Sequence, residues 1–321
     1  MRVPEELLEV LRQENKFIIA SHINPEGDAL GSSIALCLAL KSIGKEAHVF
    51  NTDGVPYLYQ FLPSMQLIKT SLDGLPTWQY CLVLVDCNEP DRAGIEDYRF
   101  KLNIVVDHHL TRKSFGDVKW IEPESAATGL MIYHIIKDLG IKIDRDMAEN
   151  LYTAISIDTG TFRYDNTTSE VLRVAAELVD LGADPARVAI RLYESWTYNR
   201  FKLLLEMLNT MELIKIKDIK VAFTHITLDM FRQTDTTQAD TENFSNFPRM
   251  IDEVEVSVMF RQTDDDAWKA SMRGKGAVNL ALVAASLGGG GHRNAAGFKA
   301  EGSLEDLKAR LIKSIEDNIN Q

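Results

Sequence analysis

The chain has 321 residues, which is long enough for two domains with their own hydrophobic cores. Hydrophobic residues make up 45% and charged residues 26% of the sequence, as in ordinary soluble globular proteins, and the net charge of −12 argues against a protein that coats long nucleic acid. The three cysteines lack CxxC spacing, which argues against a disulfide framework or zinc knuckle and favours a reducing cytoplasm. We predict no membrane span, because no apolar stretch is long enough to cross a bilayer. We predict no signal peptide, because residues 1–13 have the pattern of a charged amphipathic helix.

The first half of the sequence alternates short apolar runs with helical patterns. We predict strands at 17–21, 47–51, 81–86 and 103–107, and helices at 29–43 and 126–139. Because these strands are apolar on both faces, they indicate an α/β fold, a parallel sheet with helices on both faces. Ligands in such sheets bind beyond the carboxyl ends of the strands, where the strand order reverses.

Helical patterns continue through 146–157, 169–181 and 185–213, and the last is interrupted by a polar stretch at 194–200. We therefore divide the chain into an α/β domain at 1–185, a helical linker at 186–215 and a smaller α+β domain at 216–321. Within that smaller domain we predict strands at 219–226, 254–262, 267–272 and 297–300, and a helix at 279–286. The polar segment 233–246 is compatible with a loop or with the start of a helix.

Acidic and histidine residues follow four of the apolar runs. His22, Glu26 and Asp28 form one turn, and the other positions are Asp86, Asp107-His108-His109 and Asp158. Carboxylates and imidazoles without a thiolate suit Mn²⁺, Mg²⁺ or Co²⁺. Taken singly, Asp28, Asp86 and Asp158 are also compatible with helix caps or strand ends. Taken together with two adjacent histidines after a buried strand, they favour a metal centre.

These four motifs resemble those of the DHH phosphoesterase superfamily. The segments Gly288-Gly289-Gly290-Gly291-His292 and Ala295-Ala296-Gly297-Phe298 resemble the signature of its DHH-associated C-terminal domain. The resemblance covers nearly the whole chain and points to the bifunctional oligoribonuclease/pAp phosphatase group.

The resemblance implies two divalent ions of the Mn²⁺ type. His22, Glu26 and Asp86 would hold one ion, and Asp28, Asp86, His108 and Asp158 would hold the other, with Asp86 as the bridge. Glu26 stands where the family more commonly has Asp. Asp107 would orient an imidazole, and His109 would contact the substrate phosphate.

The second group of candidate residues would bind the substrate. A glycine run followed by His292 and Arg293 can offer backbone N–H groups and a cation to a phosphate, although a flexible hinge has the same composition. We include Gly289, Gly290, Gly291, His292, Arg293 and Asn294 in this group. Arg273 resembles the substrate-binding arginine of the family, and Arg112 is a further cationic candidate. Phe162 and Tyr164 could stack on a base or pack in the core.

Two bound ions can lower the pKa of a bridging water and direct it at a phosphorus atom. We therefore predict a metal-dependent phosphohydrolase, with its active site between two domains. The resemblance implies hydrolysis of short oligoribonucleotides and removal of the 3′-phosphate of pAp. Linear or cyclic dinucleotides (pApA, cyclic di-AMP) remain alternative substrates, and a non-catalytic nucleotide-binding regulatory module is the alternative from another class. No groove for long nucleic acid and no membrane partner is expected, and a homodimer is left open.

Overall fold

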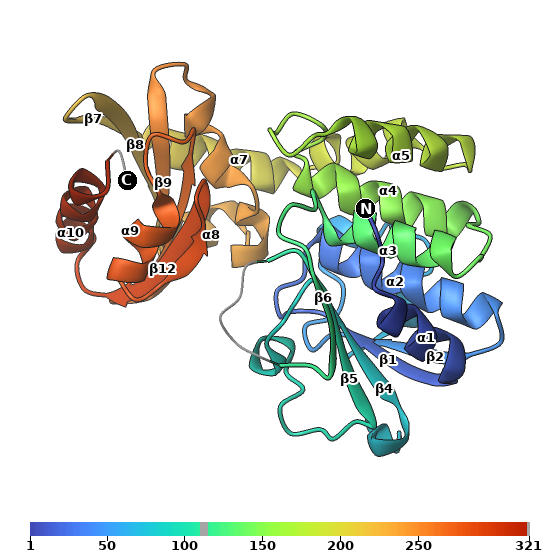
Figure 1. Cartoon of the computed structure of the whole chain (residues 1–321). Coiled ribbons are helices and arrows are strands. Elements are labelled where there is room, and N and C mark those ends of the chain that lie inside the picture. Colours follow the sequence, from blue (N-terminus) through green and yellow to red (C-terminus); the bar gives the residue numbers. More distant parts are fainter. Residues whose placement is uncertain (110–114, 320–321) are drawn as a thin grey trace. The chain divides into compact units, whose positions relative to one another are not determined.

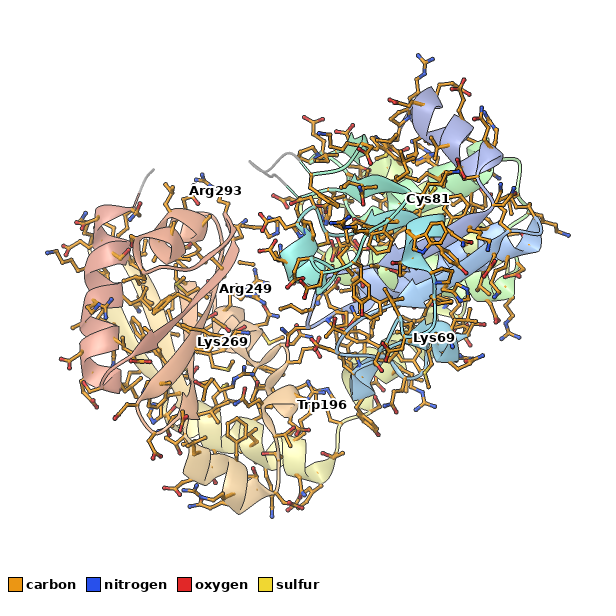
Figure 2. All side chains as sticks on the ribbon, turned by 90° about the horizontal axis from the view of Figure 1, so that it is seen from below. Lys69, Cys81, Trp196, Arg249, Lys269 and Arg293 are labelled. Carbon is orange, nitrogen blue, oxygen red and sulfur yellow. The ribbon has the colours of Figure 1, made fainter. Side chains whose placement is uncertain are left out.

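The computed structural model describes residues 1–109 and 115–319. The chain forms two compact units, Met1–Ser195 and Trp196–Gln321 (Figure 1; Trp196 is labelled in Figure 2). The segment 186–215, expected as a linker, is divided between the units. None of the helices in the described part of the chain has both the length and the apolar character needed to cross a membrane.

The first unit contains a sheet of six parallel strands in the order β3-β2-β1-β4-β5-β6. The strands are β1(Lys16–Ala20), β2(Glu46–Phe50), β3(Ile68–Lys69), β4(Cys81–Val85), β5(Leu102–Asp107) and β6(Val118–Ile121). The predicted parallel α/β sheet is confirmed, and its short edge strands β3 and β6 were not predicted. The strand order reverses between β1 and β4, which creates the point where doubly wound sheets bind ligands.

The two faces of this sheet are covered differently, whereas helices were expected on both. The α-helices lie on the side of one face, where Phe17, Val83 and Val106 contribute to the core, and α5 packs on α4 rather than on the sheet (Figure 1). They are α1(Glu5–Gln13), α2(Gly27–Ser42), α3(Thr128–Asp138), α4(Arg145–Asp158), α5(Ser169–Asp180) and α6(Pro185–Ala189), followed by the π-helical turn η5(Ile190–Glu194). On the other face, Ile18 and Leu82 pack beneath loops and 3₁₀ turns. The 3₁₀ turns of this unit are η1(Tyr57–Tyr59), η2(Met65–Leu67), η3(Thr77–Gln79) and η4(Pro90–Ala93).

The second unit is built on a mixed six-stranded sheet in the order β11-β12-β10-β9-β8-β7, in which only β8 and β9 run parallel. Its strands are β7(Glu212–Ile216), β8(Ile219–Ile226), β9(Val254–Asp264), β10(Ala267–Gly274), β11(Gly290–His292) and β12(Ala295–Glu301). The helical prediction for 185–213 was wrong at its end, because Glu212 already begins β7. Gly290 and Gly291 of the glycine run belong to the edge strand β11.

Helices cover both faces of the second sheet. One face packs on α9(Leu280–Ser286) and α10(Leu304–Asp317) through residues such as Met272 and Phe298. The opposite face packs at strands β8 and β9 on α7(Tyr198–Asn209) and α8(Leu228–Thr234). The remaining 3₁₀ turns are η6(Gln238–Thr241), η7(Phe244–Asn246) and η8(Pro248–Met250). The first two lie within the polar segment 233–246, which is therefore neither a plain loop nor the start of a long helix.

Candidate metal centre

Four elements of the first unit bring the acidic and histidine residues together. His22 follows β1, Asp86 follows β4, and Asp107 is the last residue of β5. The fourth contribution, Asp158, comes from the carboxyl end of helix α4. The centre therefore lies at the carboxyl ends of the strands that flank the reversal in strand order.

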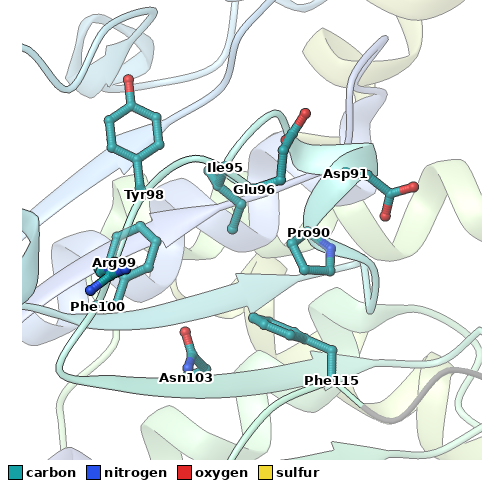
Figure 3. A pocket seen from close by; sticks show the side chains of 9 residues that line it. All are labelled: Pro90, Asp91, Ile95, Glu96, Tyr98, Arg99, Phe100, Asn103 and Phe115. Atoms are coloured by element: carbon teal, nitrogen blue, oxygen red, sulfur yellow. The ribbon is translucent and has the colours of Figure 1, made fainter.

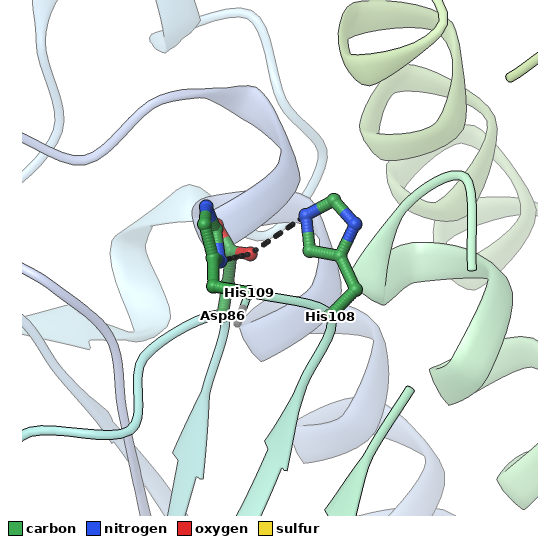
Figure 4. A group of neighbouring side chains, drawn as sticks. All are labelled: Asp86, His108 and His109. Atoms are coloured by element: carbon green, nitrogen blue, oxygen red, sulfur yellow. Dashed lines mark ion pairs between the residues drawn. The ribbon is translucent and has the colours of Figure 1, made fainter. Parts of the chain in front are cut away.

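Asp86 is central to this cluster. Its Oδ2 lies 3.5 Å from His22 Nε2, and its Oδ1 lies 3.5 Å from both His108 Nε2 and His109 Nδ1. Figure 4 shows both imidazoles directed at this carboxylate. Asp86 is 2% exposed and has a φ of 56°, in the left-handed region that costs free energy for a residue other than glycine. The surrounding structure holds this strained backbone in place, as is common at functional sites.

Backbone carbonyls determine which ring nitrogens face the cluster. His22 Nδ1 lies 2.8 Å from the carbonyl oxygen of Ile23, and His108 Nδ1 lies 3.0 Å from that of Ser125. A carbonyl only accepts, so each Nδ1 carries the proton in the neutral ring and each Nε2 presents a lone pair. His108 Nε2 is buried without a hydrogen-bond partner, although Asp158 Oδ2 is 3.1 Å away. Carboxylate oxygens of Asp28, Asp86 and Asp158 lie 3.9, 3.5 and 3.1 Å from this nitrogen, so it is placed as a metal ligand would be.

Asp28 is held by the amino end of helix α3. Its fully buried carboxylate accepts from the backbone N–H of Thr128 at 2.7 Å and of Gly129 at 2.8 Å, and from Ser32 Oγ at 2.9 Å. Thr128 Oγ1 also donates to Asp86 Oδ1 at 2.9 Å. The amino end of a helix favours an anion, so these contacts orient two carboxylates of the cluster. The sequence reasoning missed Thr128 and Gly129, and their position at the start of a predicted helix was the available signal.

Glu26 is the N-cap of helix α2. Its carboxylate accepts from the N–H groups of Asp28 and Ala29, each at 3.1 Å. The alternative interpretation of Asp28 as the cap was therefore wrong, since Asp28 points instead to α3. Capping leaves room for a second role, because one ligand atom each from His22, Glu26 and Asp86 lie within 4.8 Å of one another.

The cluster holds more negative charge than its imidazoles balance. Burial raises the pKa of Glu26 and of Asp28 well above the usual range, and the nearby charges of Asp158 and Asp86 raise both further. Burial alone would lower the pKa of His108, yet the surrounding carboxylates raise it to about 11. Divalent cations would relieve this repulsion.

Three sets of ligand atoms have metal-like spacing within the described residues. They are His22, Glu26 and Asp86; Asp28, His108 and Asp158; and Asp86, His108 and His109. The structure thus brings together all six residues that the sequence suggested as ligands. Asp107 lies beside them: its carboxylate accepts from Asn88 Nδ2, and its Oδ1 lies 2.7 Å from His109 Nδ1.

The candidate substrate residues lie in the second unit. His292 of β11, Ala295 of β12 and Arg273 of β10 are aligned across three neighbouring strands. An added Cβ would overlap the Gly297 oxygen at Gly289 and the Ala295 oxygen at Gly291. These two glycines are therefore required for close packing on β12.

The turn that follows β11 is held by backbone contacts. The carbonyl of Arg293 accepts from Leu280 N at 2.8 Å, and that of Asn294 accepts from Gly274 N at 2.9 Å. The side chains of His292, Arg293 and Asn294 are exposed.

Arg112 lies outside the described residues. Of the two aromatic candidates, Phe162 packs on Tyr152 with 5.8 Å between ring centroids, whereas Tyr164 is 38% exposed.

A cavity of about 450 Å³ lies apart from the cluster, under the loop-covered face of the first sheet (Figure 3). Its lining combines aromatic and charged side chains, from Pro90, Asp91, Ile95, Glu96, Tyr98, Arg99, Phe100, Asn103 and Phe115. None of the candidate ligands lines it, so this cavity is not the metal centre.

Comparison with known proteins agrees with the division of the chain into two units. A model described as the DHH family, N-terminal domain, matches residues 16–155, and a DHHA1 domain model matches residues 218–321. The bifunctional oligoribonuclease and PAP phosphatase NrnA of Thermus thermophilus is 34% identical over 325 residues, covering 100% of this chain and 95% of the relative. The protein of the same name from Bacillus subtilis is 27% identical, with 91% of each chain covered.

A solved structure supports the same fold. An exopolyphosphatase-related protein from Bacteroides fragilis superposes with a TM-score of 0.90 at 26% identity, covering 98% of this chain and 95% of that chain.

Proposed function

Because the chain belongs to the DHH family with a C-terminal DHHA1 domain, we propose that it is a metal-dependent phosphoesterase that hydrolyses short oligoribonucleotides and removes the 3′-phosphate of pAp. The observation that carries the proposal is the buried cluster around Asp86, in which His108 Nε2 lacks a hydrogen-bond partner. The names of the relatives supply the substrate class.

The residues of the cluster fit two divalent ions. We assign His22, Glu26 and Asp86 to one ion and Asp28, Asp86, His108 and Asp158 to the other, with Asp86 shared. Mn²⁺ is our first choice, with Mg²⁺ or Co²⁺ as alternatives, because the ligands combine carboxylates with imidazoles and Mg²⁺ prefers oxygen ligands. A thiolate ligand is not assigned, since Cys87 donates to the Glu89 carbonyl. When bound, such ions would supply a water of lowered pKa and offset the negative charge on the phosphoryl oxygens.

Asp107 and His109 have supporting roles in this proposal. The Asp107 carboxylate holds the His109 ring through Nδ1 and also accepts the backbone N–H of His109 at 3.1 Å. These two contacts fix the orientation of the ring, and we propose that His109 contacts a substrate phosphate. Asn88 holds the other oxygen of Asp107, so the pair has a defined geometry.

The second unit contributes the substrate-binding residues. We propose that Arg273 and His292, aligned across the sheet, bind a phosphate of the nucleotide together with Gly289, Gly290, Gly291, Arg293 and Asn294. Gly290 is exposed on the edge strand, and an added Cβ there would meet no atom within 4 Å, so a phosphate can approach the backbone closely. Arg112 stays a candidate from the sequence alone.

The test is hydrolysis of pApA, pAp and cyclic di-AMP in parallel, with Mn²⁺ or with EDTA. We expect AMP from pApA and phosphate from pAp with Mn²⁺ alone. Asp86→Ala and His108→Ala should lower kcat by about 100-fold or more, because each removes a ligand of the centre. Wild-type rates in both variants would contradict the proposal. Preferential cleavage of cyclic di-AMP would support the dinucleotide alternative, and nucleotide binding without turnover would support a regulatory module.

A further inference from the structure

A group of basic side chains lies on one face of the second sheet. Lys299 of β12 pairs with Lys269 of β10, and Lys269 pairs with Arg261 of β9. Residues paired directly across antiparallel strands point to the same face, so the three cations form one row. Their neighbours in sequence, such as Ala270 and Phe260, point to the core under α9 and α10.

This row lies on the same face as the candidate phosphate site. Arg273 is four residues beyond Lys269 on β10, and Ala295 is four residues before Lys299 on β12, so their side chains share the face. At about 3.3 Å per residue, the row with Arg273 and His292 is about 13 Å from the row with Lys269 and Lys299. The two rows are therefore separate positions along the strands, although their charges still interact, since the charge of Arg273 lowers the pKa of Lys269.

The row of Arg261, Lys269 and Lys299 has an excess of positive charge. Within the described part of the chain, none of Arg261, Lys269 and Lys299 forms an ion pair with a carboxylate. Arg261 instead donates to Thr241 Oγ1 at 2.8 Å and to the Gln238 carbonyl at 3.0 Å. Burial lowers the pKa of Lys269, and the charges of Arg261, Lys299 and Arg273 lower it further. Such crowding is unfavourable unless an anion is bound.

Small residues separate the two rows. Ser271 of β10, Gly297 of β12 and Gly290 of β11 pair with one another across the sheet. This part of the face therefore has little side-chain bulk between two groups of cations. A linear polyanion of regularly spaced charges matches that pattern, and it suits a protein whose overall charge is −12 because a local basic surface can invert the field. Lys269 is labelled in Figure 2.

We infer that Arg261, Lys269 and Lys299 form a second phosphate-binding site, which holds the backbone of a single-stranded oligonucleotide beyond the nucleotide bound at Arg273 and His292. The inference rests on the proposed function, since it concerns the same substrate. The second sheet then distinguishes oligonucleotides by their length. A pentanucleotide reaches Arg261, Lys269 and Lys299, whereas a dinucleotide does not extend far beyond Arg273 and His292.

The experiment compares Lys269→Gln, Lys299→Gln and the double variant of the full-length protein on a dinucleotide and a pentanucleotide. We expect the double variant to lower the ratio of kcat/KM for the pentanucleotide to that for the dinucleotide roughly tenfold, mainly through KM. Lys313→Gln is the matched control, because it removes an exposed lysine on α10, which covers the opposite face.

Binding of a fluorescent pentanucleotide in EDTA provides a second readout that needs no hydrolysis. The slope of log Kd against log salt should fall by about 0.7 for each phosphate that the variant no longer neutralises, and Lys313→Gln should leave it unchanged. An unchanged length ratio and salt slope in the double variant would overturn the inference while leaving the proposed function intact. Absence of hydrolysis by the wild type would instead refute the proposed function, and the binding slopes would still test the basic row. Because Lys299 is exposed, its single variant tests the idea even if Lys269→Gln unfolds.

Discussion

At the scale of single residues, Glu26 combines two roles that are usually separate. Its carboxylate caps α2 through the N–H groups of Asp28 and Ala29. It also has an oxygen within 4.8 Å of ligand atoms of His22 and Asp86, close enough for the three residues to share one ion. The turn pattern in the sequence suggested the ligand role but not the cap. The cap depends on the start of α2 at Gly27, and helix starts are poorly defined by sequence pattern.

Replacing Glu26 with Gln should separate these roles. The amide oxygen of Gln can still accept both N–H bonds, so the free energy of unfolding in EDTA should change by no more than about 1 kcal/mol. Loss of the negative charge should raise the Kd for Mn²⁺ about tenfold or more. Calorimetric titration with Mn²⁺ measures this, and Glu26→Asp, which keeps the carboxylate, should bind more tightly than Glu26→Gln. Equal Kd values for wild type and Glu26→Gln would remove Glu26 from the ligand set.

At the scale of elements, the approach of α2 to α4 places Asp28 and Asp158 in one cluster. Almost all of α2 is buried, and an added Cβ at Gly31 would lie 2.5 Å from the backbone oxygen of Asn150 on α4. Glycine is usually unfavourable inside a helix, so here close packing outweighs helix propensity. The pattern in the sequence predicted both helices but could not show that they touch.

Substituting Gly31 with Ala should therefore destabilise the protein, opposite to the usual effect of Gly→Ala in a helix. We expect a loss of about 1–3 kcal/mol, because the backbone of α4 must shift. Chemical denaturation measures the change, with Lys41→Ala at the exposed end of the same helix as a control expected within about 0.5 kcal/mol of wild type. A Gly31→Ala protein more stable than wild type would show that the helices have room to separate.

At the scale of the whole molecule, the buried carboxylates link folding to metal binding. Burial and mutual repulsion raise the pKa values of Glu26 and Asp28, so the metal-free cluster opposes the fold that contains it. An ion that binds only the folded state stabilises that state in proportion to the logarithm of its concentration over Kd.

Mn²⁺ at about 100 times its Kd should add about 2.7 kcal/mol, which corresponds to a rise in Tm of roughly 5–10 °C. Scanning calorimetry with Mn²⁺ and with EDTA measures the difference. The rise should largely disappear in His108→Ala and persist in Asp180→Asn, which alters an exposed carboxylate on α5. A similar rise in all three proteins would place the bound ion elsewhere.

The sequence by itself determined the fold class and the chemical character of the site. The spacing of hydrophobic residues along strands and helices is a local property, so the alternation of strands and helices in a parallel α/β fold could be predicted. The acidic and histidine residues that end or follow β1, β4 and β5 indicated a metal centre. The resemblance to the DHH family followed from the same motifs.

Only the tertiary structure decided how these parts meet. It placed the amino end of α3 against Asp28, put the end of the glycine run in an edge strand, and aligned Lys269 with Lys299 and Arg261. Each of these depends on contacts between residues far apart in the chain, and their register is set by packing that no local pattern contains.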